Sequence, residues 1–308
     1  MESNQYDLII VGTGPAGLTA GTYAARYNLK TLILGEEHGG SIADAHKVCN
    51  FPTYKEIKGS ELAEKIKDQA EEYGAEIKMG RVEDIETNDE LTIKTGFGDE
   101  YQGKTLLLAT GTQRKHLNLD REEEFLGKGV SYCATCDGRF FDDQVVGIIG
   151  GSNAAATAAL FLADVAKKVY LIFVEENLIA VEAWQDQVRK TDNIELVKAN
   201  SVTKLLGDEE LEGVELEKKF NRQKELELKG LFVEIGSLPN MELSEDLGLD
   251  LTKEGYVKVD EAQKTNHDLI WAAGDITDNS NDFRQAVTAS AEGAVAANSI
   301  YKYIKNIN

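Results

Sequence analysis

The sequence contains few cysteines: only Cys49, Cys133 and Cys136 occur in 308 residues. With so few thiols and no signal-peptide pattern, we expect a reducing, cytoplasmic location, where a disulfide is usually catalytic. Long apolar runs are also missing. Segments such as 106–109 and 145–149 have the length of a strand, far short of the roughly 20 residues that span a membrane. We therefore predict a soluble protein that is not inserted in a membrane.

Positive charge is scarce as well, because 33 Lys and Arg stand against 54 Asp and Glu, which gives a formal net charge of −21. Such a surface repels phosphate backbones and anionic lipids, so nucleic acid is not an expected partner. The basic segment 114–116 is either a docking patch for an acidic protein or a solvated turn. The length predicts about two domains, and the hydrophobic fraction of 42% with 28% charged residues fits a soluble enzyme.

Two of the cysteines stand three residues apart in the segment Cys133-Ala134-Thr135-Cys136-Asp137-Gly138. Residues at this spacing share one face of a helical turn, and a small adjustment brings their Cβ atoms to the roughly 3.8 Å that a disulfide requires. A Cys-x-x-Cys pair also lowers the pKa of one thiol, and Asp137 is placed to protonate the other sulfur. We predict a redox-active dithiol with Cys133, Cys136 and Asp137 as the catalytic residues.

Three other interpretations of this segment remain open. The cysteines could pack as buried free thiols, or form a purely structural disulfide. They could also join His46 and Cys49 in a Cys3His zinc site, because zinc needs four ligands and one Cys-x-x-Cys supplies two. The neighbouring acid and glycine argue against packed thiols, and a reducing cytosol argues against a structural disulfide.

The chain opens with a strand, a glycine turn and a helix. The apolar run 6–11 is followed by Gly12-Thr13-Gly14-Pro15-Ala16-Gly17 and by Ala- and Leu-rich residues to Asn28. In this pattern Gly12 permits the tight turn, Gly14 lets a pyrophosphate approach, and Gly17 lets helix and strand pack closely. The strand 31–34 then leads to Glu36 and Glu37, about 20 residues past the glycines, where a ribose-binding acid belongs. These features predict dinucleotide binding.

The same pattern recurs behind the dithiol, with a strand at 145–149, the turn 150–153, an Ala-rich helix to 166 and a strand at 169–174. Here Ser152 replaces the second glycine and Ala155 the third. Hairpin-like strands follow over 195–235. The segment 236–240 is expected to cross back to the first domain. We therefore predict an α/β fold with two Rossmann-like nucleotide-binding domains.

Later segments add further candidates for ligand binding. The apolar strand 106–109 runs into Thr110-Gly111, and the strand ending at 273 runs into Gly274-Asp275, whose carboxylate can accept hydrogen bonds from the hydroxyls of an extended ligand. Phe283-Arg284-Gln285-Ala286 opens a helix to about 303, whose N-terminus favours electron-rich oxygens.

With these motifs in this order, the chain resembles the low-molecular-weight thioredoxin reductases over nearly its whole length. The matching segments are Gly12 to Gly17, Ala109 to Gly111, Cys133 to Gly138, Gly274-Asp275 and Arg284 to Ala286. The resemblance implies three-layer ββα domains: an FAD-binding domain made of residues 1–113 and 241–308, and an inserted domain, 114–240, that carries the dithiol. It also implies a homodimer and a thioredoxin or glutaredoxin-like protein as substrate.

By the same resemblance, Cys136 lies nearest the flavin, Cys133 attacks the partner's disulfide, and Asp137 is the acid. Asn50 falls in the family's Glu-Asn-x-Pro segment near the flavin, although Cys49 replaces the Glu. The expected FAD-binding residues are Gly12, Gly14, Pro15, Ala16, Gly17, Glu36, Glu37, Gly40, Ser41, Asn50, Ala109, Thr110, Gly111, Gly274, Asp275, Arg284, Gln285 and Ala286.

The sequence departs from the family after the second glycine turn. NADPH-using members carry His-Arg-Arg, with one further Arg four residues on, to hold the 2′-phosphate, whereas this chain has Phe173-Val174-Glu175 and Ile179. Without these cations a phosphate site loses most of its attraction, so NADPH is a doubtful donor. Glu175 could instead bind a ribose hydroxyl of NADH, if Ser152 permits. We favour a third possibility, in which the chain uses no pyridine nucleotide. Relatives of this kind are reduced by ferredoxin or by a reduced deazaflavin, and their segment that corresponds to residues 39–45 looks similar to this one.

The predicted reaction passes electrons from FAD to the Cys133–Cys136 disulfide and then to a thioredoxin-like protein through a mixed disulfide. In the family the inserted domain rotates, and we expect hinges at 112–115 and 237–240. A flavoprotein thiol oxidase and a non-enzymatic redox sensor remain alternatives of another class. Cys49 is expected to be a packed free thiol, with a third redox thiol as the other hypothesis.

Overall fold

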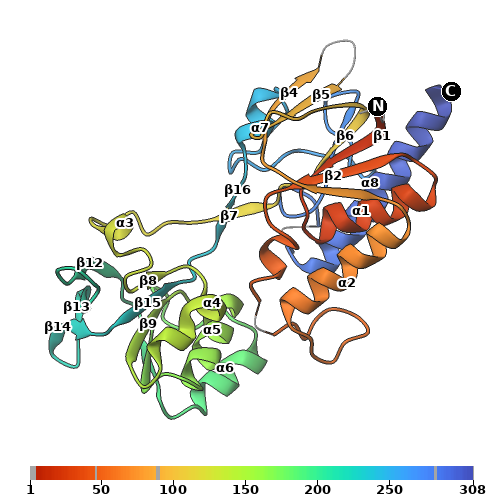
Figure 1. Cartoon of the computed structure of the whole chain (residues 1–308). Coiled ribbons are helices and arrows are strands. Elements are labelled where there is room, and N and C mark those ends of the chain that lie inside the picture. Colours follow the sequence, from red (N-terminus) through yellow and green to blue (C-terminus); the bar gives the residue numbers. More distant parts are fainter. Residues whose placement is uncertain (1–4, 46, 88–90, 281–282, 308) are drawn as a thin grey trace. The chain divides into compact units, whose positions relative to one another are not determined.

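The computed structural model describes residues 5–45, 47–87, 91–280 and 283–307 (Figure 1). These residues form two compact units: unit 1 contains 1–113 and 238–308, and unit 2 contains 114–237. Unit 1 thus takes its chain from both ends of the sequence, and unit 2 comes from the middle. The predicted α/β fold with two Rossmann-like units is confirmed. Residues 238–240, which the sequence-based division gave to the inserted domain, belong to unit 1 in the structure.

Unit 1 is built on a mainly parallel sheet with strand order β3-β2-β1-β6-β5-β4, in which β17 also pairs with β6. The β4–β5 and β5–β6 pairs are antiparallel, whereas β1, β2, β3, β6 and β17 run parallel. The elements are β1 (Gln5–Val11), α1 (Pro15–Arg26), β2 (Thr31–Gly35), the 3-10 turn η1 (Gly40–Ile42), α2 (Gly59–Glu72), β3 (Glu76–Met79), β4 (Val82–Thr87), β5 (Leu91–Thr95), β6 (Glu100–Leu108), α7 (Glu242–Asp246), β17 (Ile270–Ala272) and α8 (Ala286–Ile307).

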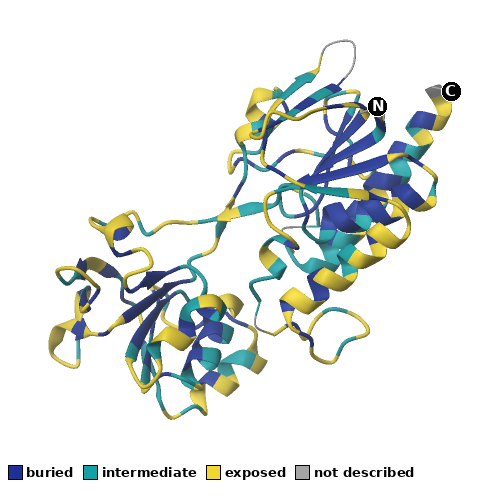
Figure 2. Cartoon of the chain, viewed as in Figure 1, coloured by how far each residue is buried: buried dark blue, intermediate teal, exposed yellow. Residues whose placement is uncertain are grey.

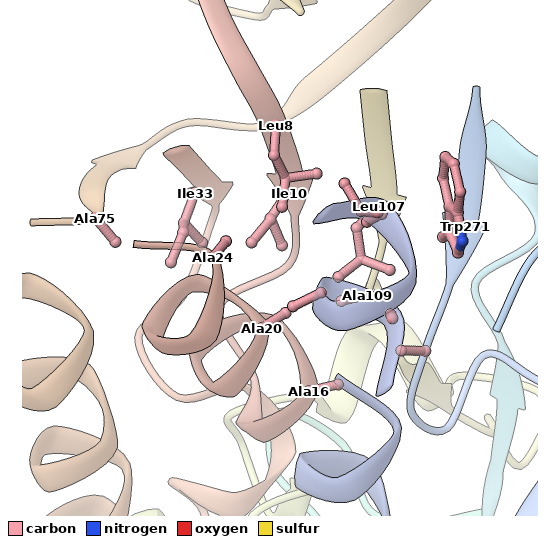
Figure 3. Close-up of a cluster of buried hydrophobic side chains, with 14 of the residues drawn as sticks. Leu8, Ile10, Ala16, Ala20, Ala24, Ile33, Ala75, Leu107, Ala109 and Trp271 are labelled. Carbon is pink, nitrogen blue, oxygen red and sulfur yellow. The ribbon is translucent and has the colours of Figure 1, made fainter. Parts of the chain in front are cut away.

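Both faces of this sheet are covered, which is why β1 reads as a continuous apolar run. Leu8 and Ile10 pack with the alanines of α1 and α8 in one cluster, while Ile9 and Val11 pack with β5 on the opposite face. Figure 3 shows Leu8, Ile10 and Leu107 pointing toward α1. In Figure 2 the central strands β1 and β2 are coloured mostly as buried, and exposed residues lie on the outer side of α2. The sheet is thus packed on α1 and α8 on one face and on apolar side chains of β5 and of residues 249–276 on the other.

Unit 2 repeats this architecture. Its parallel sheet has the order β11-β10-β9-β15-β8, and a separate antiparallel sheet has the order β12-β13-β14. One face of the parallel sheet packs on α5 and α6, and the other packs on the antiparallel sheet. The elements are α3 (Glu122–Phe125), β8 (Val130–Ser131), α4 (Ala134–Asp137), η2 (Gly138–Phe141), β9 (Val145–Ile149), α5 (Asn153–Ala163), β10 (Lys168–Ile172), α6 (Glu182–Arg189), β11 (Ile194–Val197), β12 (Val202–Leu206), β13 (Gly213–Phe220), β14 (Gln223–Glu227) and β15 (Gly230–Val233).

The chain crosses between the units at β7 (Thr112–Arg114) and β16 (Ser237–Pro239), which pair with each other in a small sheet. Backbone hydrogen bonds continue this pairing on either side, from Lys115 N to the Gly236 carbonyl at 3.0 Å and from Asn240 N to the Gly111 carbonyl at 3.2 Å. Both crossings fall in the segments where the sequence predicted hinges. Hinge motion itself stays a prediction.

Element ends differ from the sequence-based expectation by a few residues. The first helix was predicted to reach Asn28 but ends at Arg26, because Asn28 takes a left-handed φ of 58° and cannot continue a helix. The last helix begins at Ala286 rather than Phe283. Among the residues that the structure describes, no helix combines the length and apolar character needed to cross a bilayer.

Candidate active site

The Cys-x-x-Cys segment forms a short helical turn in unit 2, and its two sulfurs are bonded to each other. Cys133 is the N-cap of α4 and Cys136 lies within it, with Cα atoms 5.3 Å apart and an S–S distance of 2.07 Å. The backbone N–H of Cys136 donates a hydrogen bond to the Cys133 sulfur at 3.2 Å. Cys136 is exposed, whereas Cys133 is half-buried. Because a backbone donor already points at the Cys133 sulfur, a thiolate on Cys133 would be stabilised here.

Asp137 is tied to the dithiol by a serine that the sequence analysis did not identify. The buried Ser131 hydroxyl donates to the Asp137 carboxylate at 2.7 Å and accepts from the Cys133 N–H at 3.0 Å. Ser131 therefore fixes the carboxylate relative to the backbone of Cys133. A signal was present, since residues 131 and 133 stand two apart in an extended segment and share one face.

A second polar cluster, centred on Glu122, lies at the residue that precedes the dithiol in sequence. The buried Glu122 accepts hydrogen bonds from the hydroxyl of Tyr132, the residue before Cys133, and from the Leu117 and Leu119 N–H groups. His116 Nδ1 lies 3.4 Å from the same carboxylate. Although burial acts to raise the pKa of Glu122, the hydroxyl and backbone donors outweigh it and lower that pKa. For Tyr132, burial and then its bond to Glu122 raise the pKa. This cluster holds the strand that leads into the dithiol.

The first glycine turn has the shape predicted for a cofactor cradle in unit 1. A Cβ on Gly12 would sit 2.0 Å from the Ala109 carbonyl oxygen, and one on Gly17 would sit 1.9 Å from the Gly12 carbonyl oxygen. Both glycines are therefore required by the fold itself. Gly14, the N-cap of α1, is different: its φ of −79° suits any residue, and the nearest atom to an added Cβ is the Gly39 carbonyl oxygen at 3.9 Å. None of the residues that the structure describes comes close enough to demand a glycine at 14, so its small size fits the approach of a ligand.

The loop after β2 folds back over this turn. Thr13 donates its hydroxyl to the Glu37 carbonyl and accepts the Gly39 N–H through its own carbonyl. Gly40 has a left-handed φ of 58°, and a Cβ added to it would sit 3.2 Å from the Gly14 Cα. Of the predicted ribose acids, Glu36 lies 3.4 Å from Arg81, and Glu37 is exposed.

The remaining predicted cofactor residues are placed as follows. Pro15 opens α1, Ala16 is buried at its start, Ser41 is exposed in η1, and Ala109, Thr110 and Gly111 follow the end of β6.

Two predicted cofactor residues from distant parts of the sequence meet in unit 1. The Asn50 side-chain amide donates to the Gln285 side-chain oxygen at 2.7 Å, although 235 positions separate them in sequence. Cys49, next to Asn50, is an exposed free thiol rather than the packed one that was expected. His46, which the zinc hypothesis needed, lies outside the described residues.

Gly274 and Asp275 lie directly after β17, next to α8. A Cβ on Gly274 would sit 2.8 Å from the Ala16 Cβ, so this loop touches the start of α1. Burial raises the pKa of Asp275, the nearby Arg284 opposes that rise, and Glu292 adds to it. Arg284 reaches the Thr277 carbonyl at 3.4 Å and stacks on Tyr256 with its guanidinium 3.7 Å from the ring centroid. Ala286 is the first residue of α8.

The second glycine turn, in unit 2, has the same backbone shape with different side chains. Ser152, the N-cap of α5, has φ −81° and ψ 180°, which match φ −79° and ψ −179° at Gly14. In the second turn the Ser152 side chain therefore projects from the position that has no side chain at Gly14 in the first turn. The carboxylate of Glu175 lies 3.1 Å from the position of a Cβ on Gly151, and Val174 and Ile179 are 67% and 65% exposed. The turn therefore presents a carboxylate and two apolar side chains where the family's cations would stand.

Taken together, unit 1 contains a turn that can receive a pyrophosphate and a half-buried acid for ligand hydroxyls, and unit 2 contains a disulfide with a fixed carboxylate. These are the parts of a flavin-dependent disulfide oxidoreductase. The residues of unit 1 fit FAD, because there is room for a pyrophosphate beside Gly14, next to the loop at Gly39 and Gly40.

Comparisons with known proteins agree with this class. The profile of the family described as "Pyridine nucleotide-disulphide oxidoreductase" matches residues 6–293. A thioredoxin reductase of Peptoclostridium litorale is 37% identical, over 99% of this chain and 98% of its own length. The crystal structure of T. acidophilum thioredoxin reductase superposes with a TM-score of 0.92 at 35% identity, covering 99% of this chain and all of that one.

A third relative differs in its name. The crystal structure of a ferredoxin-flavin thioredoxin reductase from Clostridium acetobutylicum has a TM-score of 0.52 at 30% identity, and the match covers 98% of this chain and 99% of that one. The chain belongs to the pyridine nucleotide-disulphide oxidoreductase family, within its low-molecular-weight thioredoxin reductase branch. It is accordingly an FAD-dependent oxidoreductase that acts on a sulfur group.

Proposed function

We propose that this chain reduces disulfides of thioredoxin- or glutaredoxin-like proteins, and that its electrons come from a donor other than NADPH, namely reduced ferredoxin or a reduced deazaflavin. The observation that carries the proposal is the second glycine turn. It combines Ser152 at the position of Gly14, the carboxylate of Glu175 over Gly151, and exposed apolar side chains at 174 and 179.

The argument against NADPH is electrostatic. The 2′-phosphate of NADPH carries about two negative charges and is normally held by bidentate arginines. Here the half-buried Glu175 would face it with a like charge, and the two neighbouring side chains offer no hydrogen-bond donor. The net charge of −21 on the chain adds to the repulsion. The Clostridium acetobutylicum relative, named for ferredoxin and flavin, supports a protein donor as the alternative source of electrons.

In the dithiol, each residue has a distinct part. FAD, when bound, would supply a carrier that can hold the two electrons needed to open a disulfide. Cys136, the exposed member of the pair, takes up the electrons, and the Cys133–Cys136 bond opens to two thiols. Cys133 then attacks the substrate disulfide as a thiolate, stabilised by the Cys136 N–H at 3.2 Å. Asp137, held by Ser131 at 2.7 Å, exchanges the proton that the sulfurs gain and lose.

The exchange is balanced by simple thiol chemistry. Attack by Cys133 forms a mixed disulfide and releases one partner thiol; Cys136 then attacks Cys133, releases the second partner thiol and restores the intramolecular disulfide. The α4 turn holds the two Cα atoms 5.3 Å apart, within the range that a disulfide needs. The pair can therefore close again without unfolding its surroundings.

NADH is a second candidate donor, because one observation favours it. A carboxylate at the end of the second strand of a nucleotide-binding unit is the usual partner of the ribose hydroxyls of NADH, and Glu175 lies over the glycine turn in that manner. Ser152 opposes this candidate, since its side chain stands where a pyrophosphate would approach. We also propose, from the family, a homodimer located in the cytoplasm; sedimentation of the purified protein tests the dimer.

The deciding experiment adds NADPH, NADH, reduced ferredoxin and a reduced deazaflavin separately to the purified flavoprotein without oxygen and follows bleaching of the flavin absorbance. We expect fast bleaching by ferredoxin or deazaflavin and slow bleaching by NADPH. Efficient reduction by NADPH would contradict the proposal, and efficient reduction by NADH alone would favour the second candidate. Rapid reoxidation by air in the presence of a small dithiol would instead identify a thiol oxidase, and inertness to every donor would indicate a sensor.

A further inference from the structure

A buried carboxylate on α8, Glu292, has no part in the functions described so far. Its side chain is only 7% exposed, within a helix segment otherwise made of small and apolar residues. Both of its oxygens accept hydrogen bonds. One accepts from the Gly274 N–H at 2.7 Å and from the Thr277 hydroxyl at 3.2 Å, and the other accepts from the Ser280 hydroxyl.

All three donors belong to one loop, residues 274–280, which begins with the Gly274-Asp275 pair. Gly274 has a φ of 84°, and Ser280 has a φ of 53°. A loop with left-handed residues at both ends keeps its shape only if other contacts hold it. Backbone hydrogen bonds to Val257 hold the middle of the loop. Glu292 holds its first and last residues, so this side chain helps to set where the loop places Asp275.

The same part of α8 is fixed against the first glycine motif. Gly293, the residue after Glu292, comes so near α1 that an added Cβ would sit 2.1 Å from the Ala16 carbonyl oxygen. A Cβ added to Gly274 would likewise sit 2.8 Å from the Ala16 Cβ. Glu292 thus lies where the N-terminal glycine turn, the 274–280 loop and α8 meet, and it connects the two ends of the chain within unit 1.

We propose that Glu292 is a positioning residue of the flavin site: it holds the 274–280 loop so that Asp275 faces the hydroxyls of FAD, and its negative charge disfavours the reduced flavin relative to the oxidised one. Glu292 already acts electrostatically on this loop, because it adds to the rise in the pKa of Asp275 that burial causes first. Two-electron reduction makes a flavin more negative, so a buried anion nearby opposes it.

Two variants separate the two parts of this role. Glu292→Gln keeps the side-chain length and removes the charge, so we expect the midpoint potential of the bound flavin to become less negative. The expected change is about tenfold in the ratio of affinities for reduced and oxidised flavin, equivalent to about 30 mV for a two-electron couple. Ser280→Ala keeps the charge of Glu292 and removes one hydrogen bond between Glu292 and the loop. We expect it to weaken FAD binding about tenfold and to leave the potential unchanged.

The matched control is Glu122→Gln in unit 2. Glu122 is also 7% exposed and also accepts from a hydroxyl and backbone N–H groups, but it belongs to the other unit. Its replacement should leave both FAD affinity and flavin potential unchanged. Affinity is measured by titrating the apoprotein with FAD, and potential by dye equilibration with a chemical reductant.

Neither measurement needs the physiological donor or substrate, so the result does not depend on the proposed function. An unchanged potential in Glu292→Gln with native FAD affinity would overturn the proposal, as would an equal shift in Glu122→Gln. If Glu292→Gln fails to fold, the outcome rests on Ser280→Ala: unaltered FAD binding in that variant would refute the positioning role.

Discussion

Restoring the missing cations should convert the second glycine turn into an NADPH site. The triple variant Val174→Arg, Glu175→Arg and Ile179→Arg puts arginines at the positions where the NADPH-using family members carry them. The side chains at 174 and 179 are about two-thirds exposed, so each new ion pair with the phosphate is worth only about 0.5–1 kcal/mol. Position 175 is half-buried beside Gly151, so replacing its carboxylate by a guanidinium should contribute about 1.5–3 kcal/mol.

These contributions sum to about 2.5–5 kcal/mol, which corresponds to at least roughly a hundredfold tighter binding of NADPH. NADH lacks the 2′-phosphate, so its affinity should change far less. The assay is anaerobic reduction of the flavin at a series of NADPH concentrations, compared with NADH at the same concentrations. Glu176→Arg is the matched control for the Glu175→Arg change, because it reverses the same charge at an exposed neighbouring position.

A triple variant with unaltered selectivity between NADPH and NADH would refute the electrostatic reasoning. An equal gain in the Glu176→Arg control would show that net charge alone matters. If selectivity improves while reduction stays slow, adding Ser152→Gly should raise the rate with both nucleotides, since the serine adopts the backbone conformation of Gly14 and its side chain fills the approach path.

Three further predictions concern the dithiol. Cys136→Ser should abolish disulfide turnover and leave FAD bound; a colourless protein would contradict the assigned role. Ser131→Ala removes the 2.7 Å bond to Asp137, so single-turnover thiol exchange should slow about tenfold, by the roughly 1.5–3 kcal/mol of a hydrogen bond to a charged group; an unchanged rate would exclude this coupling. Tyr132→Phe leaves Glu122 without its hydroxyl donor and should raise the pKa of Glu122. Since that pKa is lowered in the native protein, its stabilising contribution is present above the ordinary Glu value and disappears as the pH falls through the native value. Acid unfolding of the Tyr132→Phe variant, followed by circular dichroism, should therefore begin at a higher pH than in the wild type, and coincident curves would contradict the role of Tyr132.

Much of the fold could be read from local patterns. The two strand–glycine–helix repeats predicted the two Rossmann-like units, because a strand buried on both faces reads as a continuous apolar run and a glycine turn has few substitutes. The strand 145–149 has the bounds that were expected. The placement of Cys49 was not predictable in this way, since exposure of a single residue depends on which segments fold over it.

The candidate site was only partly visible in the sequence. The Cys-x-x-Cys spacing predicted a pair of sulfurs within bonding reach, and the structure has them bonded. Ser131 and Glu292 were not identified, because a hydroxyl and an acid acquire their roles only from partners elsewhere. For Glu292 those partners lie 12 to 18 positions away.

The sequence by itself determined the chemistry of this protein: two sulfurs with an adjacent acid, a glycine turn for a dinucleotide, and the loss of the cations that would select NADPH. These are properties of residue type and short spacing, and they survive in any fold that keeps the local backbone. Only the tertiary structure decided which groups share a buried volume, such as Asn50 with Gln285 and Glu292 with the loop after β17. Hydrogen bonds and charges act over a few ångströms, so contacts between distant segments exist only once the chain has packed.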